Sequence, residues 1–190
     1  MKKGKLFVIS GPSGSGKTTL AQALLKDPRL SARLKKSVSF TTRGKRKGEK
    51  QGRDYFFISE VEFRKRLKAK KILEWTRYLG YYYGTDREYI DRQLITAEGI
   101  LLCIDIKGAR SIRRLYPADS VLLFIKPPSL AELKRRINKR CALGEEEVRE
   151  RLAAAKKELG SAAMFDYRVI NKDFKLAVKR LKGIISSELK

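Results

Sequence analysis

The sequence contains no histidine, two cysteines and 21 acidic residues against 45 lysines and arginines. Without histidine, no imidazole is available for acid–base chemistry. Cys103 and Cys141 are too few for the disulfides of a small secreted scaffold or for a cysteine zinc site. No apolar run approaches the roughly 18 residues of a membrane helix, and the run from Leu6 to Ile9 is too short for a signal peptide. These absences predict a soluble, cytoplasmic protein with no membrane partner.

The deficit of acidic residues gives the chain a formal charge of +24 at pH 7. Any partner that is selected by electrostatics should therefore be an anion. The basic residues recur on nearly every expected helix, and such a spread is a weaker signal for nucleic-acid binding than one patch. Acidic residues are also too few for the ion-pair networks used at high temperature. Nucleic acid stays open as a partner, but the sequence does not favour it.

The length of 190 residues and the apolar content of 42% fit one domain with a packed core. Short apolar runs alternate with longer segments of helical period, which is typical of parallel strands joined by helices. The pattern therefore predicts the α/β class. We expect strands at 6–10, 37–39, 100–105, 121–125 and 167–170, and helices near 17–26, 87–97, 107–115, 129–140, 145–159 and 173–188.

Residues from about 40 to 85 interrupt this alternation. They are rich in aromatic and β-forming residues, for example at 55–58 and 72–76, around one expected helix. The interruption predicts a lobe inserted into the α/β core. Two helix starts, Ser59 with Glu62 and Ser129 with Glu132, match the capping box, in which hydroxyl and carboxylate bond each other's backbone N–H groups.

A glycine-rich segment, GPSGSGKT, follows the first apolar run directly and matches G-x-x-x-x-G-K-[ST] at every fixed position. The alternative is a glycine turn that carries a lysine by chance, but the strand-to-helix context favours a phosphate-binding loop. Backbone N–H groups and the helix dipole would then hold phosphates, with Lys17 at the β and γ phosphates and Thr18 on Mg²⁺. The predicted ATP-binding residues here are Gly11, Pro12, Ser13, Gly14, Ser15, Gly16, Lys17 and Thr18.

Asp105 ends the apolar run 100–104, which places a carboxylate at the edge of the sheet where ligands of such folds bind. It is a candidate for the Mg²⁺ site or for positioning the acceptor. The alternative is an ordinary cap for helix 107–115. The phosphate loop by itself does not distinguish a nucleotide hydrolase from a kinase, although no Asn/Thr-Lys-x-Asp motif of GTPases is present.

A second set of motifs begins with S-x-T-T-R-x-x-R-x-G-E, formed by Ser39, Thr41, Thr42, Arg43, Arg46, Gly48 and Glu49. With this segment the chain resembles the guanylate kinase family, P-loop nucleoside monophosphate kinases that transfer a phosphoryl group from ATP to GMP. The resemblance covers nearly the whole chain in order. It continues through 74–75, 82–85, 105–108, 127–129, Arg136, Arg140, Arg151 and 169–171.

The resemblance implies a single domain over 1–190: a core of about 1–37 and 86–190, an inserted GMP-binding lobe of about 38–85 and a lid of about 136–151. It also implies ATP and GMP as substrates, dGMP as a further acceptor, and Mg²⁺ with ATP. Asn171 would belong to the ATP site. The sequence does not indicate an oligomeric state.

Arg43, Arg46, Tyr55 and Tyr83 are the residues that the resemblance assigns to the GMP phosphate. Arginine suits this role because its planar guanidinium binds phosphate through two hydrogen bonds, and tyrosine hydroxyls add donors of fixed geometry. The neighbouring basic residues, Lys45, Lys47, Lys50 and Arg53, are better explained as solvated charge that speeds the capture of anions.

Glu74 lies in an otherwise apolar and aromatic stretch, where its carboxylate would accept both N1–H and the exocyclic amine of guanine. Adenine lacks this donor pair, and buried groups left unmet in this way discriminate by roughly 10⁴. The alternative is a strand carboxylate that faces solvent beside Trp75. Ser39, Thr85 and Asp105 complete the GMP-binding residues that the resemblance implies.

Arg136, Arg140 and Arg151 match family arginines at or near the lid, which contact ATP and the transferring group. With Lys17 and Arg43 they form the predicted catalytic set, which would neutralise charge on the phosphoryl oxygens. Arg136 and Arg140 share one helix face at spacing i, i+4, but exposed members of an Arg/Lys-rich helix pair would look the same. No strong base is needed, because the GMP phosphate is already an anionic nucleophile.

The chain departs from the family pattern at four positions. Cys103 replaces the first aspartate of D-x-D, Lys107 a glutamine, Cys141 a glycine, and Lys172 the first aspartate of N-D-D. These changes bear on acceptor affinity, base selectivity and lid motion rather than on the phosphate chemistry. They leave open a kinase for another nucleotide or phosphorylated metabolite, and a non-catalytic scaffold is disfavoured by the intact phosphate loop.

Overall fold

The computed structural model describes residues 4–140 and 145–190. Its strands are β1 (Lys5–Ser10), β2 (Leu34–Lys36), β3 (Phe40–Thr41), β4 (Phe56–Phe57), β5 (Ile72–Tyr78), β6 (Tyr81–Asp86), β7 (Gly99–Cys103), β8 (Ser120–Lys126) and β9 (Tyr167–Ile170). Its helices are α1 (Lys17–Leu25), α2 (Pro28–Ser31), α3 (Glu60–Lys68), α4 (Arg87–Thr96), α5 (Ile106–Leu115), α6 (Leu130–Arg140), α7 (Glu145–Gly160), the 3-10 turn η1 (Ser161–Met164) and α8 (Phe174–Glu188).

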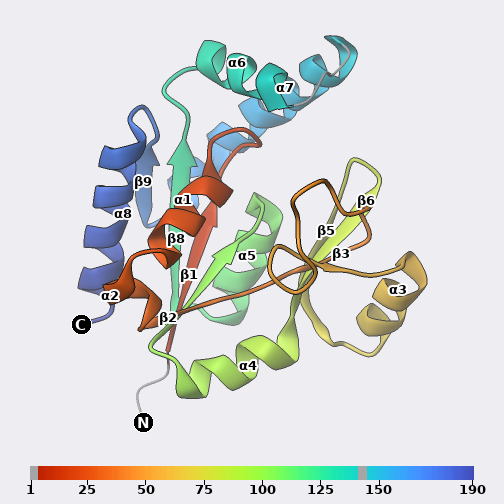
Figure 1. Ribbon diagram of the computed structural model, residues 1–190, viewed down its shortest axis with the longest axis vertical. Coiled ribbons are helices and arrows are strands. Elements are labelled where there is room, and N and C mark those ends of the chain that lie inside the picture. The colour runs from red at the N-terminus through yellow and green to blue at the C-terminus, as the bar shows by residue number, and fades with distance from the viewer. Residues whose placement is uncertain (1–3, 141–144) are drawn as a thin grey trace.

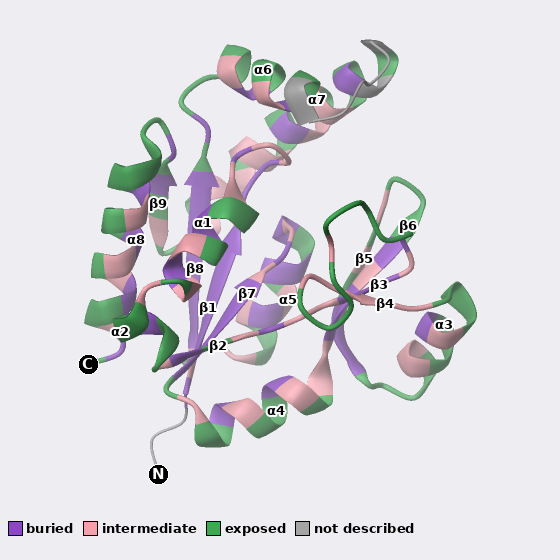
Figure 2. Cartoon of the chain, in the orientation of Figure 1, coloured by how far each residue is buried: buried purple, intermediate pink, exposed green. Residues whose placement is uncertain are grey.

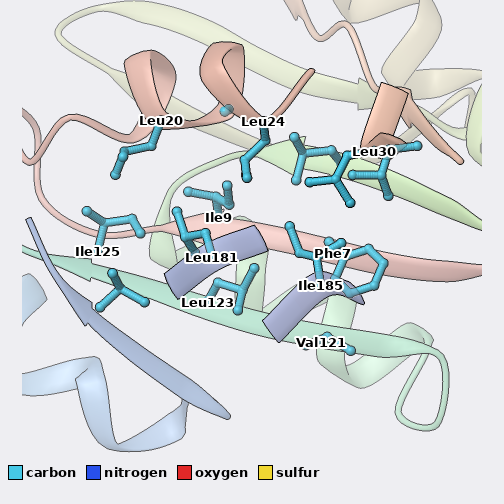
Figure 3. Close-up of a cluster of buried hydrophobic side chains, with 14 of the residues drawn as sticks. Phe7, Ile9, Leu20, Leu24, Leu30, Val121, Leu123, Ile125, Leu181 and Ile185 are labelled. Carbon is cyan, nitrogen blue, oxygen red and sulfur yellow. The ribbon is translucent and has the colours of Figure 1, made fainter. Parts of the chain in front are cut away.

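A five-stranded parallel sheet in the order β2-β7-β1-β8-β9 forms the centre of the molecule, with helices on both faces (Figure 1). Apolar side chains alternate along β1, so that Phe7 and Ile9 pack under α1 and α8, as the close-up of that cluster shows (Figure 3). Leu6 and Val8 pack on the other face, against α4 and α5. Burial on both faces explains why these strands read as continuous apolar runs. The predicted α/β class is confirmed.

The strand order sets the position of the phosphate loop. β1 lies between β7 and β8, and all three run parallel. The segment 11–18 after β1 and Asp105 after β7 therefore open at the same carboxyl edge of the sheet, where ligands of such sheets bind.

A smaller mixed sheet, β4-β3-β6-β5, is formed by residues between β2 and α4 and carries α3 on one side (Figure 1). Phe40, Phe63, Ile72 and Tyr82 form its own small core. β5 and β6 pair antiparallel around Leu79 and Gly80, both of which have a positive φ. The aromatic run that interrupts the sequence pattern thus builds a second sheet.

The strand predicted at 37–39 is wrong. β2 occupies Leu34–Lys36 instead, and 37–39 connect it to β3. Only Leu34 of β2 is fully buried, and two lysines follow it, so its sequence shows neither alternation nor an apolar run. The short helix α2 also escaped prediction, although Asp27 caps it and Pro28 occupies its first turn.

Both predicted capping boxes are half present. Ser59 accepts a hydrogen bond from the Glu62 amide, and Ser129 accepts one from the Glu132 amide, each at 3.1 Å. The two carboxylates instead form ion pairs with arginines on the following turn: Glu62 with Arg66, and Glu132 with Arg135 and Arg136.

Helices α6 and α7 pack together at the top of the molecule as drawn in Figure 1, through Leu133, Ile137, Val148 and Ala155. Part of the lid expected at 136–151, including Cys141, lies outside the described residues. Within 4–140 and 145–190, no helix combines the length and the apolar character needed to cross a membrane.

Candidate functional site

The segment 11–18, here called the donor loop, has a backbone that glycine alone adopts readily. Gly11, Gly14 and Gly16 have φ values of 137°, 84° and 95°. A Cβ on Gly11 would lie 2.3 Å from the Ile125 carbonyl oxygen, and one on Gly16 would lie 2.4 Å from Asn171 Nδ2. The loop is therefore pressed between β8 and the segment after β9, with α1 beginning at Lys17.

The Lys17 side chain lies against the first two residues of this loop. Its Nζ donates hydrogen bonds to the carbonyl oxygens of Gly11 and Pro12, at 2.5 and 2.9 Å. The ammonium group therefore lies beside the N-terminus of α1, where the helix dipole adds positive potential. Thr18, the next residue, is exposed at the same helix start. This arrangement favours a polyphosphate bound to the loop.

Asn171 and Arg136 hold the donor loop from the other side. Asn171 is 6% exposed and donates from Nδ2 to the Ser15 carbonyl at 2.8 Å. Arg136 donates to the Asn171 carbonyl at 3.0 Å and to Glu132 at 2.8 Å. Arg135 and Arg136 together lower the pKa of Glu132 to about 2, so Glu132 stays ionised and keeps Arg136 in place.

Arg43, Tyr55 and Tyr83, here called the acceptor clamp, form one cluster where the connection between β3 and β4 meets β6. The Arg43 side chain is 9% exposed, and its guanidinium carbon lies 5.6 Å from the centre of the Tyr55 ring. The Tyr55 and Tyr83 rings meet edge to face, 6.0 Å apart. Burial opposes the charge of Arg43, but Glu49 at 2.8 Å and Tyr83 raise the arginine's pKa.

Burial, with a smaller contribution from Cys103, raises the pKa of Tyr55 to about 12. Tyr55 therefore keeps its phenolic proton at neutral pH and remains a hydrogen-bond donor. A buried guanidinium beside two phenols is a set of donors suited to a phosphate dianion.

Glu74 is buried in β5, 6% exposed, and accepts a hydrogen bond from the Thr85 hydroxyl at 2.5 Å. Burial raises its pKa to about 7; the Thr85 bond lowers the pKa, and the charge of Asp105 raises it further. The alternative of a solvent-facing carboxylate is thereby excluded. A buried carboxylate with a single hydroxyl donor has further lone pairs, which suits a ligand that offers two adjacent N–H groups.

Asp105 and Glu158 are two further acidic residues near the site. Asp105 acts electrostatically on Glu74 and also on Glu158 of α7, and Lys17 acts on Glu158 in turn. Burial, opposed by Lys17 and reinforced by Asp105, raises the pKa of Glu158. Asp105 is therefore within electrostatic range of Glu74 and Glu158, and Lys17 is within electrostatic range of Glu158.

Comparison with known proteins gives one consistent family. The guanylate kinase family model matches residues 3–188. The chain belongs to the guanylate kinase family. The guanylate kinase of Listeria innocua is 42% identical over 98% of this chain and 90% of its own, and that of Thermotoga maritima 44% identical over 98% and 88%. The crystal structure of the Anaplasma phagocytophilum guanylate kinase superposes with a TM-score of 0.82 at 31% identity, covering 100% of this chain and 88% of that one.

The guanylate kinase fold brings most of the predicted site residues together. The donor loop, Asn171 and Arg136 lie on one side, and the acceptor clamp, Glu74 and Thr85 on the other. Asp105 follows β7 at the sheet edge that carries the donor loop, and it caps α5, because its Oδ1 accepts from the Gly108 amide at 2.8 Å. Both interpretations of Asp105 are therefore compatible with the structure.

The four other predicted residues lie on the segments before and after β3 and on helices α6 and α7. Arg46 is exposed, with its backbone amide bonded to Glu49 at 2.8 Å. Ser39 is half-buried between β2 and β3, and its carbonyl accepts from Phe56 at 2.9 Å. Arg151 lies half-buried on α7. Arg140 ends α6, and its side chain lies outside the described residues.

Glu158 and the close approach of Gly108 to Glu74 are features of this guanylate kinase site that sequence reasoning missed. Glu158 belongs to a helix with several other charged residues, and no spacing marks it. Gly108 was noted as part of a motif, but its reason appears only in three dimensions: a Cβ there would lie 2.5 Å from Glu74 Oε2. The glycine lets α5 pack directly on the buried carboxylate.

Replacing Gly108 by alanine should therefore displace Glu74. Overpacking of this kind typically costs about 1–3 kcal/mol, so we expect kcat/KM for GMP to fall by about tenfold while KM for ATP stays unchanged. Steady-state kinetics with each substrate varied in turn measures this. Gly183→Ala on α8 is the matched control, because a Cβ there meets nothing within 4 Å. Equal effects of the two alanines on GMP use would contradict the proposed packing.

Proposed function

We propose that the protein transfers the γ-phosphoryl group of ATP to GMP, and to dGMP, giving ADP and GDP or dGDP. The observation that carries this proposal is the buried Glu74–Thr85 pair, which packs against Gly108 of α5, the helix that begins at the sheet edge of the donor loop. Family membership supports the same conclusion, since the matching curated relatives are named guanylate kinase.

On the donor side, ATP would lie with its phosphates over 11–18. Backbone N–H groups and the α1 N-terminus would hold them, and Lys17 would contact the β and γ phosphates. Arg136, Arg140 and Arg151 are the further cations that we assign to this side of the site. Arg136 already lies against the loop through Asn171. These cations neutralise charge on the equatorial oxygens as the phosphoryl group moves.

Magnesium fits the residues at this edge. Thr18 and Asp105 supply hydroxyl and carboxylate oxygens, the hard donors that Mg²⁺ prefers, and they follow adjacent parallel strands. When bound, Mg²⁺ would supply positive charge that offsets the negative charge of the phosphates. Within the described residues no group of three or more acidic or sulfur ligands exists, so the ion would also depend on the nucleotide and water.

On the acceptor side, Arg43, Arg46, Tyr55 and Tyr83 would bind the GMP phosphate, while Glu74, Thr85, Ser39 and Asp105 line the guanine. Ionised Glu74 accepts from guanine N1–H and the exocyclic amine. The phosphate of GMP is itself the nucleophile, so no side chain has to remove a proton. The residues orient two anions in line and offset their repulsion.

We also propose that the smaller sheet and the 136–151 lid close over the two nucleotides around the larger sheet. Closure would exclude water and suppress ATP hydrolysis. The cytoplasm, which supplies both nucleotides and keeps Cys103 reduced, is the proposed location.

An assay of ADP release with GMP, dGMP, AMP, UMP and CMP as acceptors tests the proposal. We expect GMP and dGMP to be used, with at least about 10⁴-fold preference for GMP over AMP, because AMP leaves Glu74 unpaired. A reaction without acceptor measures ATP hydrolysis as the control. Similar rates with all five acceptors would overturn the guanine assignment.

A further inference from the structure

Lys36, the last residue of the edge strand β2, lies where the chain leaves the larger sheet for the smaller one (Figure 1). Its Nζ donates a hydrogen bond to the carbonyl of Arg53, across to the turn that precedes Tyr55. Its own carbonyl accepts from the Tyr89 hydroxyl of α4 at 2.9 Å. Lys36 therefore joins β2, α4 and the turn before the acceptor clamp.

The environment of Lys36 differs from that of the other lysines near this turn. Lys45, Lys47 and Lys50 are exposed, whereas Lys36 is half-buried. Most of the loop between β3 and β4, which contains those three lysines, is coloured as exposed in Figure 2. Burial lowers its pKa, and Asp54 and Cys103 partly offset that effect. A buried ammonium group needs acceptors, and a backbone carbonyl is a much stronger acceptor than a thiol.

The turn at 50–55 is held together by its own hydrogen bonds, so a displacement of Arg53 would also displace Tyr55. The Gly52 amide donates to the Tyr55 carbonyl at 2.9 Å, and the Asp54 amide donates to the Lys50 carbonyl at 3.0 Å. Asp54 also accepts from the Lys50 amide at 2.8 Å. Tyr55 in turn contacts Arg43 and Tyr83. The hydrogen bond from Lys36 to Arg53, here called the anchor, therefore affects the acceptor clamp through an internally bonded turn.

We propose that Lys36 is a positioning residue for the acceptor phosphate: its ammonium group fixes the 50–55 turn to the larger sheet and so sets where Tyr55 and Arg43 meet the phosphate. The inference rests on the proposed acceptor site. Lys36 acts through the Arg53 carbonyl and not on the reacting atoms. Its neighbour Lys35 is exposed and points to the opposite face of β2, so it cannot serve the same role.

The variant Lys36→Met keeps the length of the side chain and removes the ammonium group. Hydrogen bonds from a charged donor are stronger than those from a neutral one, so we expect KM for GMP to rise about tenfold or more. KM for ATP should change less than twofold. Lys36→Arg should restore most of the loss, because a guanidinium also donates to a carbonyl, and Lys35→Met is the matched control.

Hydrogen exchange without nucleotide tests the anchor independently of the reaction. The amides of 50–55 should exchange faster in Lys36→Met than in wild type, and at the wild-type rate in Lys35→Met. If Lys36→Met does not fold, Lys36→Gln replaces it in both measurements. Unchanged exchange, equal shifts of both KM values, or failure of Lys36→Arg to recover would overturn the inference. Wild type that does not phosphorylate GMP would instead overturn the proposed function and leave the exchange result to decide the anchor.

Discussion

Replacing Lys17 by methionine is expected to lower kcat by on the order of 10³ or more, because a cation that neutralises the transferring phosphoryl group contributes on this scale. The ammonium group lies at the mouth of the donor loop, bonded to the carbonyls of Gly11 and Pro12. Methionine keeps the length of the side chain but supplies no charge to the β and γ phosphates. Steady-state kinetics at saturating GMP measures the loss.

The matched control is Lys26→Met, at the other end of α1, where the side chain is exposed. Its activity should stay within about twofold of wild type, since exposed substitutions away from special features have small effects. GMP binding, measured by calorimetry without ATP, should be retained by Lys17→Met, because the acceptor clamp lies on the smaller sheet. Activity of Lys17→Met within tenfold of wild type would remove the donor loop from the mechanism.

The larger sheet could be predicted because most of its strands are buried on both faces. Val8, Leu102 and Leu123 belong to strands that read as apolar runs, and nearly all of the residues in those runs are buried. β2 has one buried residue in three, and its strand was wrongly predicted at 37–39 instead of Leu34–Lys36. The paired strands of the smaller sheet were recognised only as a region, since their burial depends on α3 and on each other rather than on a common core.

The donor loop could be predicted from its spacing and its strand-to-helix context, because Gly11, Gly14 and Gly16 each have a positive φ that glycine adopts readily. The acceptor site needed more: by spacing, Glu74 was as compatible with a solvent-facing strand residue as with a base pocket, and family resemblance favoured the latter. Burial of Glu74 against Gly108 depends on how α5 packs on β5, which no local pattern records. Lys36 bonds to Arg53, and Glu158 interacts electrostatically with Lys17 and Asp105, all far from them in sequence, so sequence alone gave no signal for either.

Replacing Glu74 by glutamine is expected to lower kcat/KM for GMP by on the order of 10² to 10³ and to leave KM for ATP within twofold. The carboxylate would form two charge-assisted hydrogen bonds with guanine, each worth about 1.5–3 kcal/mol. Glutamine offers only its carbonyl oxygen as an acceptor, and its NH₂ group would face one of the two N–H donors of guanine. Glu88→Gln, exposed in the first turn of α4, is the control. An equal loss for GMP and ATP would show that Glu74 does not read the base.

The pH dependence of the same variant distinguishes the charge of Glu74 from its shape. Burial raises the Glu74 pKa to about 7, and guanine requires the ionised form, so kcat/KM for GMP should rise as pH increases through about 7. The GMP phosphate also titrates, with a pKa near about 6, but it does so equally in both variants. The Glu74-dependent part of the rise should therefore be absent in Glu74→Gln.

The free energy of unfolding without ligand should decrease as pH rises, whereas kcat/KM for GMP should increase. Because the folded-state pKa of Glu74 lies above the ordinary value of 4.5, the folded protein holds a proton between about pH 4.5 and 7 that the unfolded chain has lost. The free energy of unfolding of wild type should therefore decrease across this window relative to Glu74→Gln, by on the order of 3 kcal/mol. Urea unfolding of both variants at pH 5 and 7.5 measures the difference. The buried carboxylate thus destabilises the free protein at neutral pH, because the Thr85 hydrogen bond offsets its charge only in part. A ligand with two adjacent N–H donors would offset it further.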